Sequence, residues 1–258
     1  MITSASNQKI KKLRALNSKR KERKESGLFT AEGIKILREA PAELIKEVFV
    51  SESFETDAAE LLAAKGITQY EVIADSLFKS ICDTQTPQGV ITVFCQPVCT
   101  ESEFFSRRDP FYLVLEDVQD PGNVGTIIRT AEGAGVQGII LSAGCADVFS
   151  PKTIRSTMGS VFRVPLFFTE DAVSAVKKLK ELGVQTYAAM PLASAEYDEP
   201  DYKGGTAILI GNEGNGLSDE ISAEADVALR IPMEGRLESL NAAIASAILM
   251  YAVHSKRK

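Results

Sequence analysis

The 258-residue chain has a single histidine, no tryptophan and only four cysteines. Cys82, Cys95, Cys99 and Cys145 form no C-x-x-C pair, and together with His254 they give no zinc-binding spacing. We therefore expect no bound metal. Few cysteines in a long chain indicate thiols in a reducing compartment rather than a disulfide framework, which favours a cytoplasmic protein.

A long apolar segment is also missing. The longest uncharged run, SLNAAIASAILMYAV at 239–253, is too short and too rich in alanine for a membrane span. No signal-peptide pattern is present. The Lys, Arg and Ser content of the N-terminus also suits an organellar transit peptide, but this segment continues into a foldable pattern. We interpret it as a basic arm of the mature protein and expect no membrane partner.

The overall charge argues mildly against nucleic acid, because the net charge is −6 and the pI is about 5.1. The segment 7–24 is an exception, with nine Lys or Arg residues and one acid. Its apolar residues recur every third position, so one helix face can pack while the cations project. A charge run of this kind can be a merely solvated surface. We nevertheless predict contacts with RNA or DNA for the projecting Lys9, Lys11, Lys12 and Arg14.

The pattern along the chain predicts an α/β protein of two domains. Residues 1–95 form a small α/β unit, with a strand running into a helix at 28–40, strands at 47–53 and 89–95, and a helix at 57–66. The mixed segment QPVCTESEFFSRRDP at 96–110 reads as a linker.

The second predicted domain, 111–258, alternates strands with helices. Its strands are continuous apolar runs, which indicates a parallel sheet covered on both faces. We expect strands at 111–118, 138–143, 184–190, 206–212 and 227–233, and helices at 123–135, 171–183 and 239–257.

The run GAGVQG at 133–138 fits the dinucleotide-binding pattern G-x-G-x-x-G. It lies after a helical pattern and before a strand, which is the reverse of the order that pyrophosphate binding requires. We therefore predict that Gly133 or Gly135 ends the helix in a left-handed conformation and that Gly138 begins the turn into the strand. A nicotinamide-dependent oxidoreductase has no other support in the sequence.

Three other strand ends carry polar residues. The first, LEDVQDPGNVGTIIRT at 115–130, leads into a helix that bears Asn123 and Arg129. The second, TAILIGNEGNGLSDEI at 206–221, has three glycines around Glu213, with Ser218 as the candidate N-cap of the next helix.

The third strand end, RIPMEGRLESLNAAIAS at 230–246, is expected to enter its helix at Ser239. Ser239 could simply cap that helix, and Asn241 could cap or bond locally. In an open α/β sheet, however, ligands bind beyond the carboxyl ends of the strands. We therefore expect all three segments to converge at one edge of one sheet.

Taken together, the three segments resemble the motifs of the SpoU (TrmH-like) branch of the SPOUT RNA methyltransferases. The matches are DPGNVGTIIRTAEGAG, IGNEGNGL and IPMEGRLESLNAAIASAILMY, in the family's order and spacing. RSTMGSVFRVPLF at 155–167 also looks like the family's segment between the first two motifs. The resemblance covers about 110–253, and the first 95 residues more loosely resemble a small RNA-binding domain similar to ribosomal protein L30e.

This resemblance implies an RNA 2′-O-ribose methyltransferase that uses S-adenosylmethionine, works as a homodimer and carries a deep trefoil knot in its parallel sheet. It assigns the catalytic site to Asn123, Arg129, Glu213, Ser239 and Asn241. It assigns Arg155 to RNA and places the cofactor against Met190, Pro191, Leu192, Gly211, Asn212, Glu213, Gly216, Ile231, Met233, Ser239, Leu240 and Asn241.

The motif-one arginine is the family's proposed base, but a guanidinium is essentially always protonated. A fork-like contact between Arg129 and the target phosphate is physically easier, and Asn123 and Glu213 would hold Arg129 and the loops in place. The expected substrate is 23S-type ribosomal RNA. Alternatives are a tRNA methyltransferase, a resistance methyltransferase acting on ribosomal RNA, and a non-catalytic RNA-binding or ribosome-assembly protein.

Overall fold

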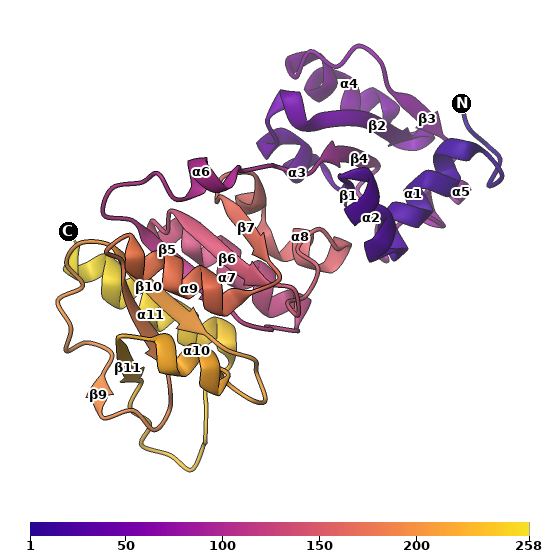
Figure 1. Cartoon of the computed structure of the whole chain (residues 1–258). Helices are drawn as coiled ribbons and strands as arrows, with labels where there is room; N and C mark the ends of the chain where they lie inside the picture. The colour runs from indigo at the N-terminus through magenta and orange to yellow at the C-terminus, as the bar shows by residue number, and fades with distance from the viewer. Residues whose placement is uncertain (258) are drawn as a thin grey trace. The chain divides into compact units, whose positions relative to one another are not determined.

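The computed structural model describes residues 1–257, which divide into two compact units (Figure 1). The first unit comprises Met1–Pro97 together with Asp147–Phe162, and the second comprises Val98–Ala146 together with the chain from Arg163 onward. The chain therefore passes between the units three times. This division differs from the expected boundaries, since a segment of the expected second domain belongs to the first unit.

The first unit is built on a four-stranded mixed sheet of order β1-β4-β2-β3. Its strands are β1 (Leu28–Glu32), β2 (Ile45–Ser51), β3 (Glu71–Ile73) and β4 (Val90–Cys95). Only the β2–β3 pair is parallel. Its helices are α1 (Gln8–Ser18), α2 (Arg20–Ser26), α3 (Ile34–Glu39), α4 (Glu55–Ala64), α5 (Asp75–Lys79) and α8 (Pro151–Thr157).

Two apolar clusters cover the two faces of this sheet, because side chains alternate along each strand. Ile10, Leu13 and Leu16 of α1 are buried in the cluster that holds Phe49, as the spacing predicts. The other cluster combines residues of α3 and α4 with the alternate strand positions, namely Leu37, Val48, Val50, Ala58, Leu62 and Val90.

Aromatic packing and a buried ion pair attach the segment 147–162 to the first unit. The rings of Phe149 and Phe162 lie 5.2 Å and 6.1 Å from the ring of Phe29. The Arg23 side chain, which is 6% exposed, makes an ion pair of 2.7 Å with Asp147. Burying the pair costs solvation, but leaving either charge alone would cost more, so the contact fixes where this segment lies.

The second unit contains the predicted parallel sheet, here of seven strands in the order β7-β6-β5-β10-β8-β11-β9. All six neighbouring pairs are parallel. The strands are β5 (Phe111–Leu115), β6 (Gly138–Ser142), β7 (Leu166–Thr169), β8 (Gln185–Ala189), β9 (Ala195–Glu196), β10 (Thr206–Ile210) and β11 (Val227–Arg230). The helices are α6 (Glu101–Phe104), α7 (Pro121–Ala134), α9 (Ala172–Glu181), α10 (Asp219–Glu224) and α11 (Ala242–Lys256).

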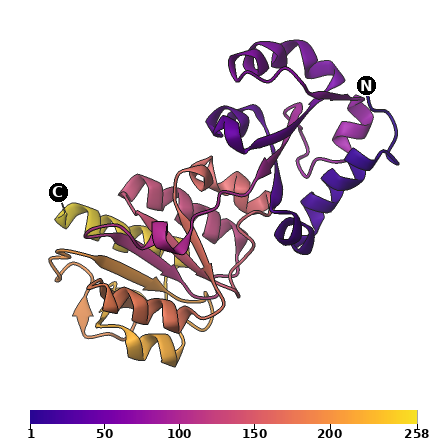
Figure 2. The ribbon, with the colours of Figure 1, turned by 45° about the horizontal axis from the view of Figure 1, so that its top comes forward.

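Helices cover both faces of this sheet, as expected (Figure 2). The helices α9 and α10 pack on one face through Val176, Leu179 and Ile221. The helices α7 and α11 contact each other, and α11 also contacts β10. The α/β class and the parallel sheet are therefore confirmed.

Several expected boundaries are wrong for identifiable reasons. The last helix begins at Ala242 rather than Ser239, because the Asn241 side chain accepts hydrogen bonds from the N–H groups of the first turn. The strand β11 ends at Arg230, before Pro232, which has no N–H group for the ladder. The expected linker contains α6, whose Phe104 is buried and accepts a hydrogen bond from the Tyr112 hydroxyl.

The interpretation of the 133–138 run as a helix end is confirmed, although Gly138 belongs to the following strand and not to the turn before it. Gly135 ends α7 with a φ of 78°, and Gly138 is the first residue of β6. No helix within residues 1–257 is both long and apolar enough to cross a membrane.

Candidate active site

The three polar loops meet at the carboxyl edge of the parallel sheet. They follow β5, β10 and β11 and lead into α7, α10 and α11. The strand β10 lies between β5 and β8, and β11 pairs with β8 on its other side. Because all these strands run in the same direction, their carboxyl ends share one edge, and loops distant in sequence become neighbours.

The carboxylate of Glu213 joins the second loop to the first. Its Oε1 accepts hydrogen bonds from the Asn123 side-chain amide at 2.9 Å and from the backbone N–H of Asp120 at 3.0 Å. Its Oε2 accepts from the backbone N–H of Gln119 at 3.0 Å. The negative charge thus lies at the N-terminus of α7, where N–H groups and the helix dipole favour an anion.

A second amide extends this connection to the third loop. Asn241 Nδ2 donates to Asn123 Oδ1 at 2.9 Å, while Asn241 Oδ1 caps α11 by accepting from the N–H groups of Ala243 and Ile244. Glu213, Asn123 and Asn241 therefore form one hydrogen-bonded series that holds three loops in register.

The same contacts determine the ionisation of Glu213. Partial burial acts to raise the pKa of the carboxyl, but the hydrogen bonds from Asn123, Gln119 and Asp120 together outweigh it, so the net pKa lies below its ordinary value of 4.5. Glu213 is therefore a carboxylate at neutral pH, which is the acceptor-only form that three donors require.

The loop after β10 turns tightly around Asn212. The Asn212 N–H and C=O bond to the C=O and N–H of Gly216, and its side-chain amide donates to the Asp117 carbonyl at 2.8 Å. At Gly211, a Cβ would lie 2.1 Å from the backbone carbon of Gly216, so no side chain fits there. Close backbone approach thus makes glycine necessary at this position.

A pocket of about 310 Å³ lies between the loops after β8, β10 and β11. Its lining combines apolar side chains with exposed backbone of the glycine loop, which suits an organic ligand with polar groups. The lining residues predicted from the sequence are Met190, Pro191, Gly211, Asn212, Glu213, Gly216, Ile231, Met233, Ser239 and Leu240.

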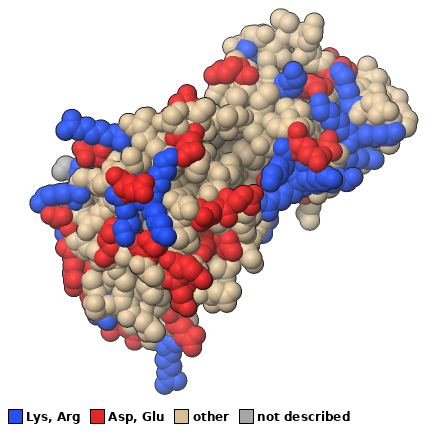
Figure 3. Space-filling view, viewed as in Figure 1, with Lys and Arg blue, Asp and Glu red and all other residues tan. Residues whose placement is uncertain are grey.

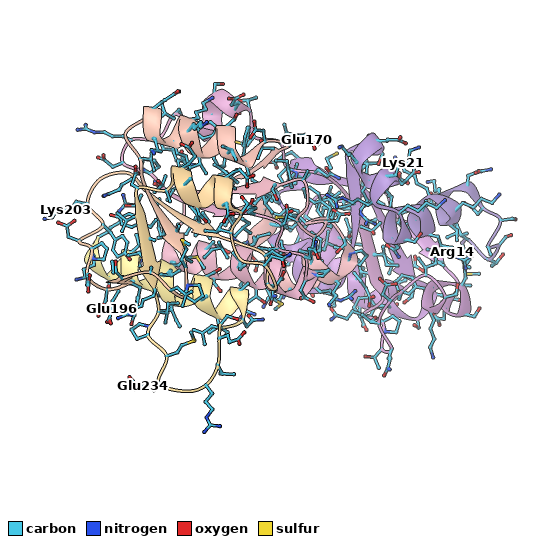
Figure 4. All side chains as sticks on the ribbon, turned by 60° about the horizontal axis from the view of Figure 1, so that its bottom comes forward. Arg14, Lys21, Glu170, Glu196, Lys203 and Glu234 are labelled. Carbon is cyan, nitrogen blue, oxygen red and sulfur yellow. The ribbon has the colours of Figure 1, made fainter. Side chains whose placement is uncertain are left out.

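Two residues predicted to contact the cofactor do not line this pocket. Leu192 is 98% exposed, and Asn241 is used in the amide series instead. The loop from β11 to α11 extends away from the sheet at Glu234 (Figure 4). Ser239 and Glu238, at the end of this loop, return to line the pocket.

Arg129 lies outside the hydrogen-bonded series. It is exposed on α7 and makes no hydrogen bond or ion pair with any residue between 1 and 257. The expectation that Asn123 and Glu213 hold this side chain is therefore wrong, although they do hold the loops. The Nδ1 atom of His254 lies 3.2 Å from the Ala134 carbonyl oxygen.

Sequence reasoning missed two acids that follow β5 directly. Glu116 accepts a hydrogen bond from the Ser218 N–H at 2.8 Å, and the Asp117 carbonyl holds Asn212. Asp117 has a φ of 52°, and its carboxylate accepts from Ser142 at 2.5 Å. The available signal was an acidic pair at a strand end on the same edge as the glycine loop.

Most of the cations predicted to contact RNA have partners within the first unit. Lys9 pairs with Glu71 at 2.6 Å, Lys12 pairs with Glu47 at 3.1 Å, and Arg14 donates to Ser80 at 2.9 Å. Within residues 1–257, Lys11 has no such partner. Arg155 also lies in the first unit, where its guanidinium is 4.0 Å from Asp83.

Comparison with known proteins identifies the class. Residues 110–251 match the SpoU rRNA Methylase family, and residues 7–92 match the MRM3-like substrate binding domain. The chain belongs to the SpoU rRNA methylase family. The predicted S-adenosylmethionine-dependent RNA 2′-O-ribose methyltransferase is therefore confirmed at the level of the family.

Full-length relatives refine this assignment. The chain is 37% identical to the 23S rRNA (guanosine(2553)-2′-O)-methyltransferase RlmP of Bacillus subtilis, over 97% of each protein. It superimposes on an AdoMet-bound rRNA methyltransferase from Sinorhizobium meliloti with a TM-score of 0.84 and 33% identity, covering 98% of this chain and 97% of that one. The SpoU methyltransferase AviRb from Streptomyces viridochromogenes, in complex with AdoMet, gives a TM-score of 0.86 and 26% identity, with coverage of 97% and 98%.

The glycine loop allows a matched pair of substitutions. We expect Gly211→Ala to abolish S-adenosylmethionine binding, because the added Cβ would overlap the backbone at Gly216. Gly214→Ala should bind nearly as the unsubstituted protein does, since its Cβ would lie 3.5 Å from Asn212 Oδ1, an ordinary contact. Calorimetric titration with the cofactor distinguishes them, and equal affinities would contradict the packing argument.

The lowered pKa of Glu213 predicts a pH dependence of stability. A carboxyl with a depressed folded-state pKa contributes stability above its unfolded-state value, and this contribution is lost as the pH falls through the folded-state value. The difference in unfolding free energy between the unsubstituted protein and Glu213→Gln should therefore stay constant from about pH 8 to 5.5 and shrink below about pH 4.5. Urea unfolding measured across this range checks it, and a difference that grows on acidification would refute it.

Proposed function

We propose that this enzyme methylates the ribose 2′-oxygen of one nucleotide in 23S-type ribosomal RNA. The observation that carries the proposal is the hydrogen-bonded series of Glu213, Asn123 and Asn241, which holds the family's three motif loops beside one pocket. The full-length similarity to a 23S rRNA methyltransferase and the match to a substrate-binding domain favour ribosomal RNA over tRNA. The cytoplasm is the compartment that we expect for this reaction.

The pocket residues fit S-adenosylmethionine. Main-chain groups of the glycine loop line the pocket and can meet the adenosine and amino-acid polar groups, because Gly216 carries no side chain. Met190, Ile231 and Met233 give an apolar lining. When bound, the cofactor supplies a methyl group on a sulfonium centre. The protein then has to align the ribose oxygen with that methyl group, and alignment alone can supply much of the rate.

Arg129 is the residue that we assign to the RNA phosphate. A guanidinium keeps its proton, so it cannot readily accept one from the ribose hydroxyl. Its two-pronged geometry instead fits a phosphate and would orient the adjacent sugar. Its exposure and lack of a protein partner within residues 1–257 leave the side chain available for this contact. The proton of the 2′-hydroxyl would leave to water or to that phosphate.

A homodimer would complete the site, as in the family. Two large apolar side chains of α11 support this, since Ile244 is 53% exposed and Tyr251 is 49% exposed. The helix α11 also packs against α7, which carries Arg129. Membership of the family also implies a trefoil knot, in which the C-terminal segment is threaded through a loop.

Basic side chains on the first unit would add affinity for RNA. Lys and Arg gather over α1 and α2 (Figure 3). Because several of these cations are already ion-paired, we assign the larger part of the RNA attraction to those without acidic partners within residues 1–257, such as Lys11 and Lys19.

Removing the guanidinium should stop the reaction without removing the cofactor. For Arg129→Ala, we expect methylation of a 23S rRNA transcript to fall at least about a hundredfold, while S-adenosylmethionine affinity is retained. Arg129→Lys should rescue little, because the fork is lost. Thr126→Ala, an exposed change on the same helix, is the control. Tritium transfer from the cofactor, with a tRNA pool as the alternative substrate, provides the measurement. Activity near that of the unsubstituted enzyme would refute the role, and preferential tRNA methylation would refute the substrate.

The dimer is tested separately. We expect Tyr251→Glu to shift the protein from dimer to monomer, because it places a charge in the proposed apolar interface. Leu182→Glu changes an equally exposed apolar residue, 52% exposed, at the end of α9 and should leave the dimer intact. Light scattering after size-exclusion chromatography gives the mass of each. A monomeric unsubstituted protein would contradict the assignment.

A further inference from the structure

A second pocket, of about 250 Å³, lies entirely within the first unit. Its walls are the corner between β1 and α3, the loop around 82–88, and α8 with the residue that follows it. The residues that the argument uses are Glu32, Lys35, Asp83, Gln88, Arg155 and Met158.

The inner surface of the pocket is apolar. Ala31, Ile36, Ile91 and Ile154 line it and are all at least nine-tenths buried, while Met158, which also lines it, is 38% exposed. A flat ring could therefore enter against aliphatic and thioether groups, which is how proteins commonly receive an unstacked base.

Two lining groups are already committed to the fold. The Glu32 carboxylate accepts hydrogen bonds from the Thr84 hydroxyl at 2.8 Å and from the Gln88 N–H at 2.9 Å. Burial raises the pKa of the Cys82 thiol to about 12, and nearby Glu32 acts in the same direction, so this cysteine is neutral at physiological pH. Within residues 1–257, no group of three or more His, Cys, Asp or Glu side chains is placed to hold a metal ion.

Three other lining groups are available to a ligand. Lys35 is exposed and has no ionic or hydrogen-bonding partner within residues 1–257, and the side-chain amide of Gln88 has none either. The Arg155 side chain is 42% exposed, and its one ionic partner among residues 1–257 is Asp83, at 4.0 Å. Two cations that can bind phosphate therefore accompany one amide that can read the edge of a base.

We propose that this pocket binds a single unpaired nucleotide of the RNA substrate, at a site separate from the S-adenosylmethionine pocket. The base enters the apolar pocket, Gln88 hydrogen-bonds its edge, and Lys35 and Arg155 contact the neighbouring phosphates. The proposal rests on the proposed function, because it takes RNA as the substrate. It gives the first unit a base-specific contact in addition to the non-specific attraction of α1 and α2.

Substitution of Asp83 is predicted to change RNA affinity in the opposite direction from the other substitutions in the pocket. Its carboxylate competes with phosphate for Arg155, since the two side chains are paired in the structure. Asp83→Asn should therefore strengthen RNA binding, whereas Lys35→Ala, Arg155→Ala and Gln88→Ala should each weaken it. A merely structural role for this pocket would not make one variant bind better.

The experiment is a set of RNA titrations with the full chain and a 23S rRNA transcript over a range of salt concentrations. We expect Lys35→Ala and Arg155→Ala to weaken binding about tenfold at 0.1 M salt and each to lower the salt slope by about 0.7 to 0.9. Gln88→Ala should weaken binding without changing the slope, because it removes no phosphate contact. Arg38→Ala, on the exposed surface of α3 and outside the pocket lining, is the matched control and should change binding least.

Cofactor titration of the same variants separates the two proposals. If S-adenosylmethionine binding is normal but Lys35→Ala, Arg155→Ala and Gln88→Ala all bind RNA as Arg38→Ala does, the nucleotide pocket is refuted and the methyltransferase assignment stands. If the unsubstituted chain binds the cofactor but neither binds nor methylates the transcript, the proposed substrate fails, and the pocket assignment fails with it. Ultraviolet cross-linking of bound RNA to the peptide that contains Met158 would support the pocket directly.

Discussion

The carboxylate of Glu213 is the contact on which the arrangement of the site depends. It is not paired with a cation in the Glu213–Asn123–Asn241 series. Its charge is balanced by N–H donors at the start of α7. Because a carboxylate can only accept, each of its hydrogen bonds fixes the position of a donor on another loop. Asn123 extends the series to Asn241, whose amide nitrogen donates to Asn123 and whose amide oxygen accepts from the first turn of α11. One charged group therefore determines how three strand ends are held relative to each other.

Main chain of the glycine loop forms part of the pocket lining, next to apolar side chains. The loop around Asn212 is closed by its own backbone, and close approach of the chain at Gly211 excludes even a methyl group. A surface of N–H and C=O groups can bind the polar edges of a cofactor with little entropic cost of ordering long side chains. The reactive RNA group would then have to be positioned from outside this surface, which agrees with an arginine on α7 that has no partner within residues 1–257.

Sequence reasoning predicted correctly those features that depend only on local residue pattern and on strand direction. Continuous apolar runs predicted the parallel sheet, and polar residues at three strand ends predicted one shared edge. The pattern could not show that Asn123 bonds to both Glu213 and Asn241, because such pairing depends on strand order, and strand order is set by contacts between distant segments. Arg129 was wrongly attached to the same series for this reason.

The position of 147–162 was equally inaccessible to sequence reasoning. Phe149 and Phe162 meet Phe29 across more than a hundred residues of chain, and Arg23 reaches Asp147 across a similar separation. A chimera made by joining one N-terminal module to another catalytic module at residue 97 would lose part of its own packing, leaving the face around Phe29 open to solvent. Recombination between relatives would have to exchange 147–162 together with the first 97 residues, so the inheritance of the two modules is coupled because their sequences are interleaved.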